Sequence, residues 1–230
     1  MKSTDKAILL NRINYSESSL IITYYTLRNG IQKFLFQGGK KKANNLFPLS
    51  ISEITYYNRP DSSLGKVTAS ETSKILNEIP FDPVKSTIAF FIAEVLSKCL
   101  QTEESEHLLF QFLEEKISEL DQNKEIALFP IQFLIDFSEY LGIQPHIVDD
   151  NAVFFNLMEG TISNFKPDGD IFVQGEVVEL VRACILKSSN IHHSKKLRAE
   201  ALDRLVQYFQ LHTPQFKHLK TLEVIREVLY

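Results

Sequence analysis

Residues 28–42 read RNGIQKFLFQGGKKK, and this stretch decides the fold predicted for the first part of the chain. Its first three residues are the signal of a tight hairpin. Ile31–Gln37 then places Phe34 and Phe36 on one face and Lys33 on the other, which is the alternation of a half-buried strand. Two glycines end this strand, and three lysines follow in a polar loop. The stretch therefore predicts a strand between two turns.

The same two-residue period recurs on both sides of this stretch. We expect further strands at Ala7–Ile13, Ser19–Thr26, Leu46–Tyr57 and Leu64–Thr72. Short strands that follow one another in this way, without helical spacing, are typical of a small closed or partly open barrel. The predicted fold class is therefore α+β, with a five-stranded β-barrel in residues 1–79 and an α-helical domain in residues 80–230.

Helical spacing of apolar residues replaces the strand period after Pro80, and Pro83 suits the first turn of a helix. The predicted helices are Ser86–Leu100, Glu106–Leu120, Ala127–Leu141, Glu176–Lys187, Lys195–Leu211 and Leu219–Leu229. Residues 149–173 lack the helical period. They predict a short β-hairpin inserted in the helical domain, with its turn at Met158–Gly160.

The composition is that of a globular protein in a reducing compartment. Hydrophobic residues make up 44% of the chain and the formal net charge is -4. Cys99 and Cys184 lie far apart in apolar surroundings, which favours two buried thiols over a disulfide. The sequence shows no signal peptide and no apolar run near the roughly 18 residues of a membrane span. We expect a soluble cytoplasmic protein.

The sequence lacks the residue patterns of common catalytic and metal sites. The position five before Gly39 is Phe34, so the glycine spacing of a phosphate-binding loop is missing. No nucleophile elbow, zinc-protease motif or dinucleotide fingerprint occurs. His192 and His193 are adjacent and diverge on a helix, so they do not form an i,i+4 metal pair. We expect neither an enzyme nor a metal site.

The basic character of residues 28–42 suggests a binding function. No acidic residue occurs between Glu17 and Glu53, while the gap holds Arg28, Lys33 and Lys40–Lys42. Small barrels bind single-stranded nucleic acid by combining cationic loops, which pair with phosphates, with aromatic side chains, on which bases stack. The alternative is an ordinary solvated basic turn.

Aromatic residues that could stack on bases occur on the predicted strands. Strand alternation turns only one of Tyr56 and Tyr57 outward, and we expect Phe34 and Phe36 to belong to the core. A second basic cluster, Lys195, Lys196 and Arg198, either extends a DNA path or receives an acidic peptide tail. Its alternative is a charged helix start, although cations there oppose the helix dipole.

The order of these motifs resembles the bacterial RecO family of recombination mediators and DNA repair proteins. The matching N-terminal residues are Arg12, Tyr15, Glu17, Ser18, Thr26, Gly30, Gly39 and Lys40–Lys42. Further along, LFPLSISEI resembles the family's next strand, FPIQFLIDFSEYLGIQP its helix ending in Leu-Gly and Pro, and LKTLEVIREVL its closing helix. The resemblance covers almost the whole chain in order.

The resemblance implies an OB-fold barrel that binds single- and double-stranded DNA, with strand annealing and contacts to RecR and to single-stranded DNA-binding protein. Together these help to load RecA onto coated strands at the nucleoid. The DNA contacts expected on this reading are Arg28, Lys33, Lys40, Lys41 and Lys42, with Arg12 and Tyr15 as weaker candidates. Many family members carry a four-cysteine zinc motif, but residues 149–173 contain no cysteine or histidine, so we expect no zinc.

Two other functions remain open at this stage. One is a protein–protein adaptor whose barrel binds no nucleic acid, and it predicts no salt-dependent affinity for DNA. The other is an enzyme that uses an acidic helical cleft, and it requires paired carboxylates in a deep pocket.

Overall fold

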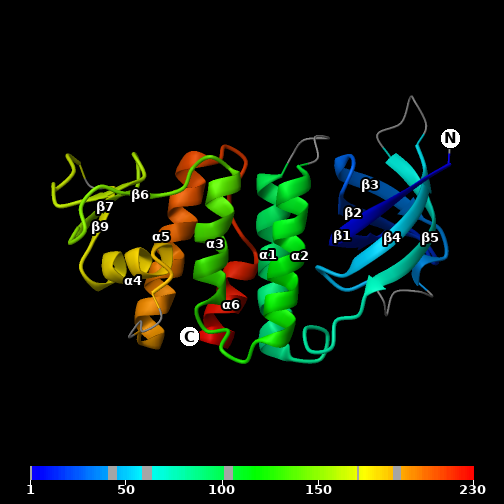
Figure 1. Ribbon diagram of the computed structural model, residues 1–230. Helices are drawn as coiled ribbons and strands as arrows, with labels where there is room; N and C mark the ends of the chain where they lie inside the picture. The colour runs from blue at the N-terminus through cyan, green and yellow to red at the C-terminus, as the bar shows by residue number, and fades with distance from the viewer. Residues whose placement is uncertain (1, 41–45, 59–63, 101–105, 170, 189–192) are drawn as a thin grey trace. The chain divides into compact units, whose positions relative to one another are not determined.

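The computed structural model describes residues 2–40, 46–58, 64–100, 106–169, 171–188 and 193–230 (Figure 1). The chain divides into two compact units, Met1–Asn123 and Lys124–Tyr230. The first unit contains a barrel and two helices. The second contains the remaining helices and a small second sheet.

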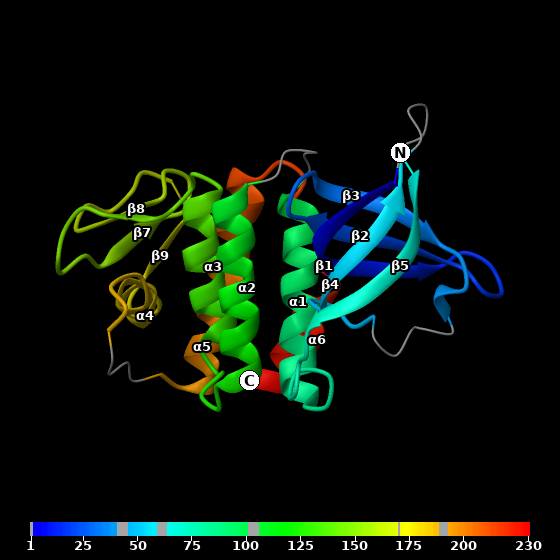
Figure 2. The same ribbon diagram turned by 45° about the vertical axis from the view of Figure 1, so that its right-hand side comes forward.

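The barrel is closed and its strands follow the order β1-β2-β3-β5-β4 (Figures 1 and 2). The strands are β1 (Lys2–Asn14), β2 (Leu20–Thr26), β3 (Gly30–Phe36), β4 (Ile51–Tyr57) and β5 (Leu64–Lys74). Neighbouring strands are antiparallel except β3 and β5, which are parallel. The predicted fold class is confirmed. However, β1 begins at Lys2 rather than Ala7, because its polar first half pairs with β4.

The inward faces of the strands form the barrel core. Phe34 and Phe36 are almost fully buried there, so the prediction that both belong to the core is confirmed. The ring of Phe34 lies against Tyr56, with 4.9 Å between centroids. Gly65 on β5 makes room for this ring, because a Cβ atom at that position would lie 2.6 Å from Phe34. The core thus fills the barrel with aromatic side chains.

Two helices complete the first unit, α1 (Pro83–Cys99) and α2 (His107–Gln122). The Asp82 side chain caps α1 by accepting from two backbone N–H groups of its first turn, and Pro83 follows it as predicted. Tyr25 of β2 stacks on Phe110 of α2, with 5.9 Å between ring centroids. An ion pair of 2.5 Å also joins Lys6 of β1 to Glu114 of α2. Helix α2 therefore packs on the β1 and β2 side of the barrel.

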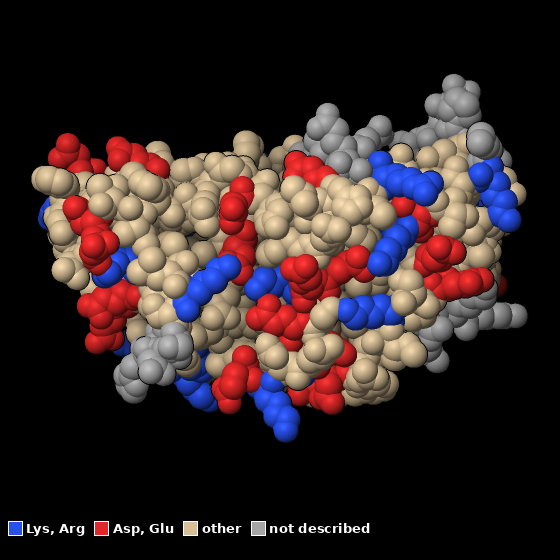
Figure 3. Space-filling model, viewed as in Figure 1, with Lys and Arg blue, Asp and Glu red and all other residues tan. Residues whose placement is uncertain are grey.

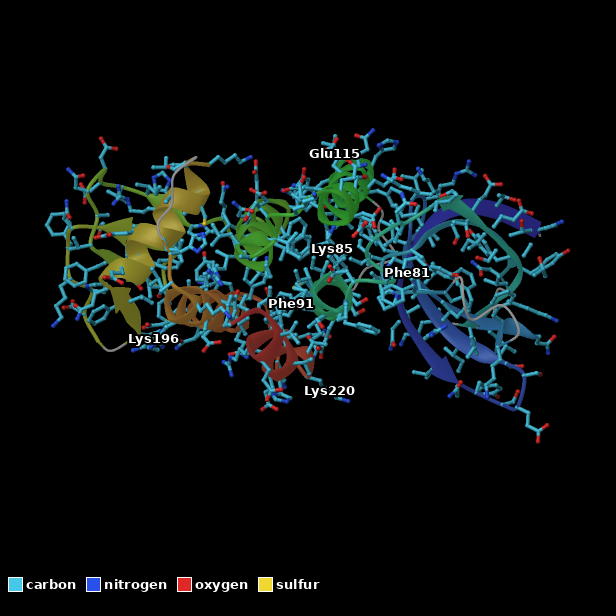
Figure 4. The ribbon with its side chains drawn as sticks, turned by 90° about the horizontal axis from the view of Figure 1, so that it is seen from below. Phe81, Lys85, Phe91, Glu115, Lys196 and Lys220 are labelled. Atoms are coloured by element: carbon cyan, nitrogen blue, oxygen red, sulfur yellow. The ribbon has the colours of Figure 1, made fainter. Side chains whose placement is uncertain are left out.

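A buried carboxylate ties the segment between β5 and α1 to the end of α2. The Asp121 side chain accepts hydrogen bonds of 2.9 Å from the backbone N–H groups of Asn77, Glu78 and Ile79. Lys85 of α1 donates from Nζ to the Asp121 carbonyl at 2.8 Å. Figure 4 shows Lys85 between α1 and α2. Burial acts to raise the Asp121 pKa, but the N–H donors and the Lys85 charge together hold that pKa below its ordinary value.

The two cysteines are free thiols in different surroundings. Cys184 is buried, as predicted, whereas Cys99 at the end of α1 is only half-buried. Burial raises the pKa of each thiol to about 12. Both therefore stay protonated and unreactive near neutral pH.

The second unit combines helices with a sheet of four short strands. The helices are α3 (Phe129–Tyr140), α4 (Glu176–Ile185), α5 (Lys195–His212) and α6 (Thr221–Leu229). The strands are β6 (His146–Ile147), β7 (Phe154–Asn156), β8 (Thr161–Ser163) and β9 (Phe172–Gln174), in the order β6-β8-β7-β9. The predicted hairpin corresponds to β7 and β8. The sequence did not identify β6 and β9, because no tight hairpin turn marks these short strands as the Met158–Gly160 turn marks β7 and β8.

The inner face of this second sheet packs on α5. Phe155 of β7 is fully buried against Tyr208 of α5, with 5.3 Å between ring centroids. The Tyr208 hydroxyl donates to the carbonyl of Ile143 at 2.6 Å. Gly160, at the end of the β7–β8 turn, has φ of 71°, and a Cβ atom there would lie 2.5 Å from the same hydroxyl. Apolar packing and one tyrosine thus anchor the insertion to its helix.

Candidate nucleic-acid interface

The hairpin between β2 and β3 holds Arg28 at one end of the barrel. The Asp5 carboxylate accepts from the backbone N–H of Arg28 at 3.1 Å, and the Asn29 side chain donates to the Tyr56 hydroxyl at 2.9 Å. Burial raises the pKa of Asp5, although these donors act against the rise. The Arg28 side chain itself is exposed, with a long contact of 3.5 Å to the Thr4 carbonyl. A rigid turn therefore presents the guanidinium to solvent.

Lys40 lies at the opposite end of the barrel. Its backbone N–H donates to the carbonyl of Ser18 at 3.3 Å, which places it beside the loop between β1 and β2. The same loop carries Tyr15, whose side chain is 63% exposed, and it follows the strand end that carries exposed Arg12. Lys41 and Lys42 fall outside the described residues. Arg28 is separated from this end by the length of β3, about 20 Å for a strand of its size.

Lys33 lies between the two ends, on the outer face of β3. It stands opposite Thr23 of β2 and Leu64 of β5. The predicted site residues thus do not meet in one loop. Among those that the structure describes, Arg28 marks one end of β3, Lys33 its middle, and Lys40, Arg12 and Tyr15 the other end.

The outer face also carries a row of residues that sequence reasoning did not bring together. Tyr57 of β4 is 42% exposed and stands directly opposite Lys66 of β5 on one side and Lys2 of β1 on the other. Directly opposed side chains have Cβ atoms about 5 Å apart. Lys66 in turn stands opposite Leu35 of β3, two residues from Lys33. We call Lys2, Tyr57, Lys66 and Lys33 the outer platform.

The signals for this platform were present in part. Strand alternation predicted that only one of Tyr56 and Tyr57 faces outward, and the structure shows that it is Tyr57, since Tyr56 lies in the core. Lys2 was missed because the first strand was predicted to begin at Ala7, five residues after its observed start at Lys2. Lys66 was missed because the register between β4 and β5, which contains irregularities, cannot be read from the sequence.

Acidic residues limit the platform along the same two strands. Glu53 of β4 and Glu71 of β5 stand opposite each other, and Glu53 also stands opposite Lys6. In the view of Figure 3, basic and acidic side chains are mixed over the barrel. Phosphate binding is therefore favoured at the Tyr57 end of these strands and disfavoured at the Glu53 end.

The second predicted basic cluster is divided by the fold. Lys195 and Lys196 are exposed in the first turn of α5, which Ser194 caps, and Figure 4 labels Lys196 there. Arg198 is only 8% exposed, and its guanidinium contacts His193 Nδ1 at 2.9 Å and lies 5.4 Å from the centre of the Tyr230 ring. The two lysines therefore form the exposed part of this cluster.

The insertion does not present the ligands of a family-type zinc site. Residues 149–173 supply neither a cysteine nor a histidine, the donors on which structural zinc depends. Within the described residues, no three histidine, cysteine, aspartate or glutamate side chains are grouped so that they could hold a metal ion.

The described part of the chain also has no helix long and apolar enough to cross a membrane.

Comparison with known proteins gives consistent matches along the chain. Residues 1–76 match the family described as Recombination protein O N terminal, and residues 80–223 match Recombination protein O C terminal. The DNA repair protein RecO of Flavobacterium psychrophilum is 31% identical over 99% of both chains. Those of Phocaeicola vulgatus and Christiangramia forsetii are 30% and 28% identical, over 96% and 97% of both chains.

Proposed function

The chain belongs to the RecO family, and from this premise we propose that it is a DNA-binding recombination mediator whose barrel binds strands on the outer platform. Its role lies in DNA repair and recombination, and the family is not one of enzymes. The N-terminal barrel is an OB-type fold, an architecture that binds oligonucleotides through one face and its loops.

The observation that carries the proposal is the position of Tyr57 between Lys2 and Lys66. A half-exposed aromatic ring offers a surface on which a base stacks whatever its identity. An ammonium group on each neighbouring strand is within reach of the phosphates that flank such a base. Lys33 extends the row of cations onto β3. The arrangement supports binding of single strands without sequence preference.

The loop residues extend this path in the proposal. Arg28 lies beyond the platform at one end of β3, and half-buried Lys40 lies at the other end, where Arg12 and Tyr15 are exposed. Lys41 and Lys42 follow Lys40 in sequence and carry two further positive charges. We assign electrostatic contacts with phosphates to the cations and a weaker stacking role to Tyr15.

Family membership supports the wider role. In this proposal the protein acts at the nucleoid in the cytoplasm, binds single- and double-stranded DNA and anneals strands. With RecR it helps to load RecA onto strands coated by single-stranded DNA-binding protein. Lys195 and Lys196 are assigned either to an extension of the DNA path or to an acidic peptide tail.

A salt series tests the platform. We expect the double variant Lys2→Ala/Lys66→Ala to flatten the slope of log K against log salt for a single-stranded oligonucleotide by about 1.4, because each lost phosphate contact removes about 0.7. Fluorescence anisotropy of a labelled oligonucleotide measures the slope. Circular dichroism checks that the variants are folded.

The matched control is Lys124→Ala/Lys217→Ala, which removes the same charge from exposed positions outside the barrel. This control should leave the slope unchanged. If it flattens the slope equally, the loss reflects net charge and not the platform. If Lys195→Ala/Lys196→Ala alone flattens the slope, the DNA path lies on α5. If the native protein does not bind, the adaptor function replaces the mediator.

A chelator experiment tests the expectation that no zinc is needed. Treatment with EDTA should leave the Tm of the native protein unchanged. The reason is that the insertion is anchored by apolar packing of Phe155 on Tyr208, and not by a metal. Differential scanning calorimetry before and after chelation gives the comparison. A Tm that falls on chelation and recovers with zinc would contradict the expectation, since removal of a structural metal removes folding free energy.

A further inference from the structure

The outer face of the second sheet carries aromatic side chains that are partly or fully exposed. Phe155, Ile162 and Val173 point to the inner, buried side. By strand alternation, Phe154 and Phe172 point outward, and their rings meet edge to face with 5.7 Å between centroids. Phe165, just beyond β8, is 80% exposed. We call Phe154, Phe165 and Phe172 the aromatic face.

This face already holds one cation of the chain itself. The Lys166 Nζ atom lies 5.6 Å from the centre of the Phe172 ring. A cation at this distance is attracted by the negative face of the ring. The contact shows that the Phe172 ring on this face can bind a positively charged group.

The segment that carries the aromatic face is rich in carboxylates. Lys166 is the only lysine or arginine between His146 and Glu179 in the sequence. The same interval contains Asp149, Asp150, Glu159, Asp168, Asp170, Glu176 and Glu179. Figure 3 shows acidic side chains gathered over the part of the second unit that contains β6–β9. Such a surface repels nucleic acid and anionic lipid, and it attracts cations.

We propose that the aromatic face docks a basic, apolar segment of a partner protein. Apolar side chains of the segment would cover Phe154 and Phe165, and arginine or lysine side chains would pair with Asp150 and Asp168 at the rim. An aromatic centre with a polar rim is the usual anatomy of a protein interface. The inference is independent of DNA binding by the barrel.

The test uses the full chain and a fluorescein-labelled peptide in which arginine and leucine alternate. We expect Phe165→Ser to weaken binding of this peptide about tenfold, as truncation of an aromatic hot spot does. Asp150→Asn/Asp168→Asn should reduce both the affinity and its salt dependence. These positions are exposed, so the variants are expected to fold. A peptide with glutamate in place of arginine should not bind.

Matched controls come from exposed residues outside the second sheet. Phe81 is 81% exposed, so Phe81→Ser removes an equally accessible ring, and Glu115→Gln/Glu125→Gln removes the same charge as the aspartate variant (Figure 4). Both controls should bind the peptide as the native protein does. Equal losses in the controls would overturn the proposal. A loss of oligonucleotide affinity in Phe165→Ser would also overturn it, because nucleic acid would then be the occupant. A native dimer that Phe165→Ser dissociates would overturn it too, because a second copy of the chain would then cover the face.

Discussion

Tyr57→Ala is expected to weaken binding of a single-stranded oligonucleotide by about ten- to a hundredfold, because stacking of a base on an aromatic side chain contributes about 1–3 kcal/mol. The ring is 42% exposed and is not part of the barrel core, so its removal should leave the fold intact. The slope of affinity against salt should change little, since Lys2 and Lys66 remain. Fluorescence anisotropy at several salt concentrations separates the two effects.

Tyr57→Phe is the control for this prediction, because it retains the ring and removes only the hydroxyl. It should bind within about twofold of the native protein, since any base can stack on either ring. If Tyr57→Ala is folded and binds as tightly as the native protein, bases do not stack at this position. The outer platform would then be a purely electrostatic surface or no binding surface at all.

Asp121→Asn is expected to lower the free energy of unfolding of the first unit by about 3–5 kcal/mol, as breaking a buried ionic network does. The native carboxylate is 5% exposed and accepts from three backbone N–H groups, while Lys85, at 4% exposed, lies beside it. An amide has one acceptor oxygen and no charge, so at least one of the N–H groups would lose its acceptor. The Lys85 ammonium would keep its hydrogen bond to the backbone carbonyl of residue 121 but lose a nearby negative charge. Urea unfolding followed by circular dichroism measures the loss.

Glu119→Gln on the same helix is the control. Glu119 pairs with Lys116 in a half-exposed ion pair at 2.9 Å, and removing its charge should change the stability by less than about 0.5 kcal/mol. A similar loss in both variants would mean that general helix charge, and not the buried network, stabilises this unit.

The same carboxylate gives a pH dependence with a defined sign. The pKa of Asp121 is lower in the folded protein than its ordinary value of 3.8. Its contribution to stability is therefore complete above that ordinary value and is lost as the pH falls through the folded pKa. The difference in stability between the native protein and Asp121→Asn should consequently shrink below about pH 4. A difference that does not change with pH would exclude a charged Asp121 as the stabilising group.

The binding and stability predictions act on separate parts of the first unit. Asp121 holds the segment between β5 and α1, whereas Tyr57, Lys2 and Lys66 lie on the outer face of the barrel. Asp121→Asn should thus lower stability without changing the salt slope of DNA binding, measured where the variant is fully folded. Tyr57→Ala should show the reverse pattern.

Local patterns determined much of this protein from sequence alone. The two-residue period of Ile31–Gln37 placed Phe34 and Phe36 inside the barrel and Lys33 outside, because side chains alternate on any strand. The helix start at Pro83 followed from a proline suited to the first turn, and the Asp82 side chain caps it. The order of motifs along the whole chain indicated the family.

Only the tertiary structure decided which distant residues meet. Lys2, Tyr57 and Lys66 become neighbours because β4 pairs with β1 on one side and with β5 on the other, in a register that no local pattern specifies. The Asp121 carboxylate accepts a hydrogen bond from the backbone N–H of Ile79 because α2 ends beside the segment that follows β5. Arg198 is likewise buried by His193 and Tyr230, although its sequence reads as a charged helix start. The sequence alone thus determined the faces of individual strands and helices, because these depend on backbone geometry. The packing of elements decided the candidate site, because its contacts join residues far apart in the chain.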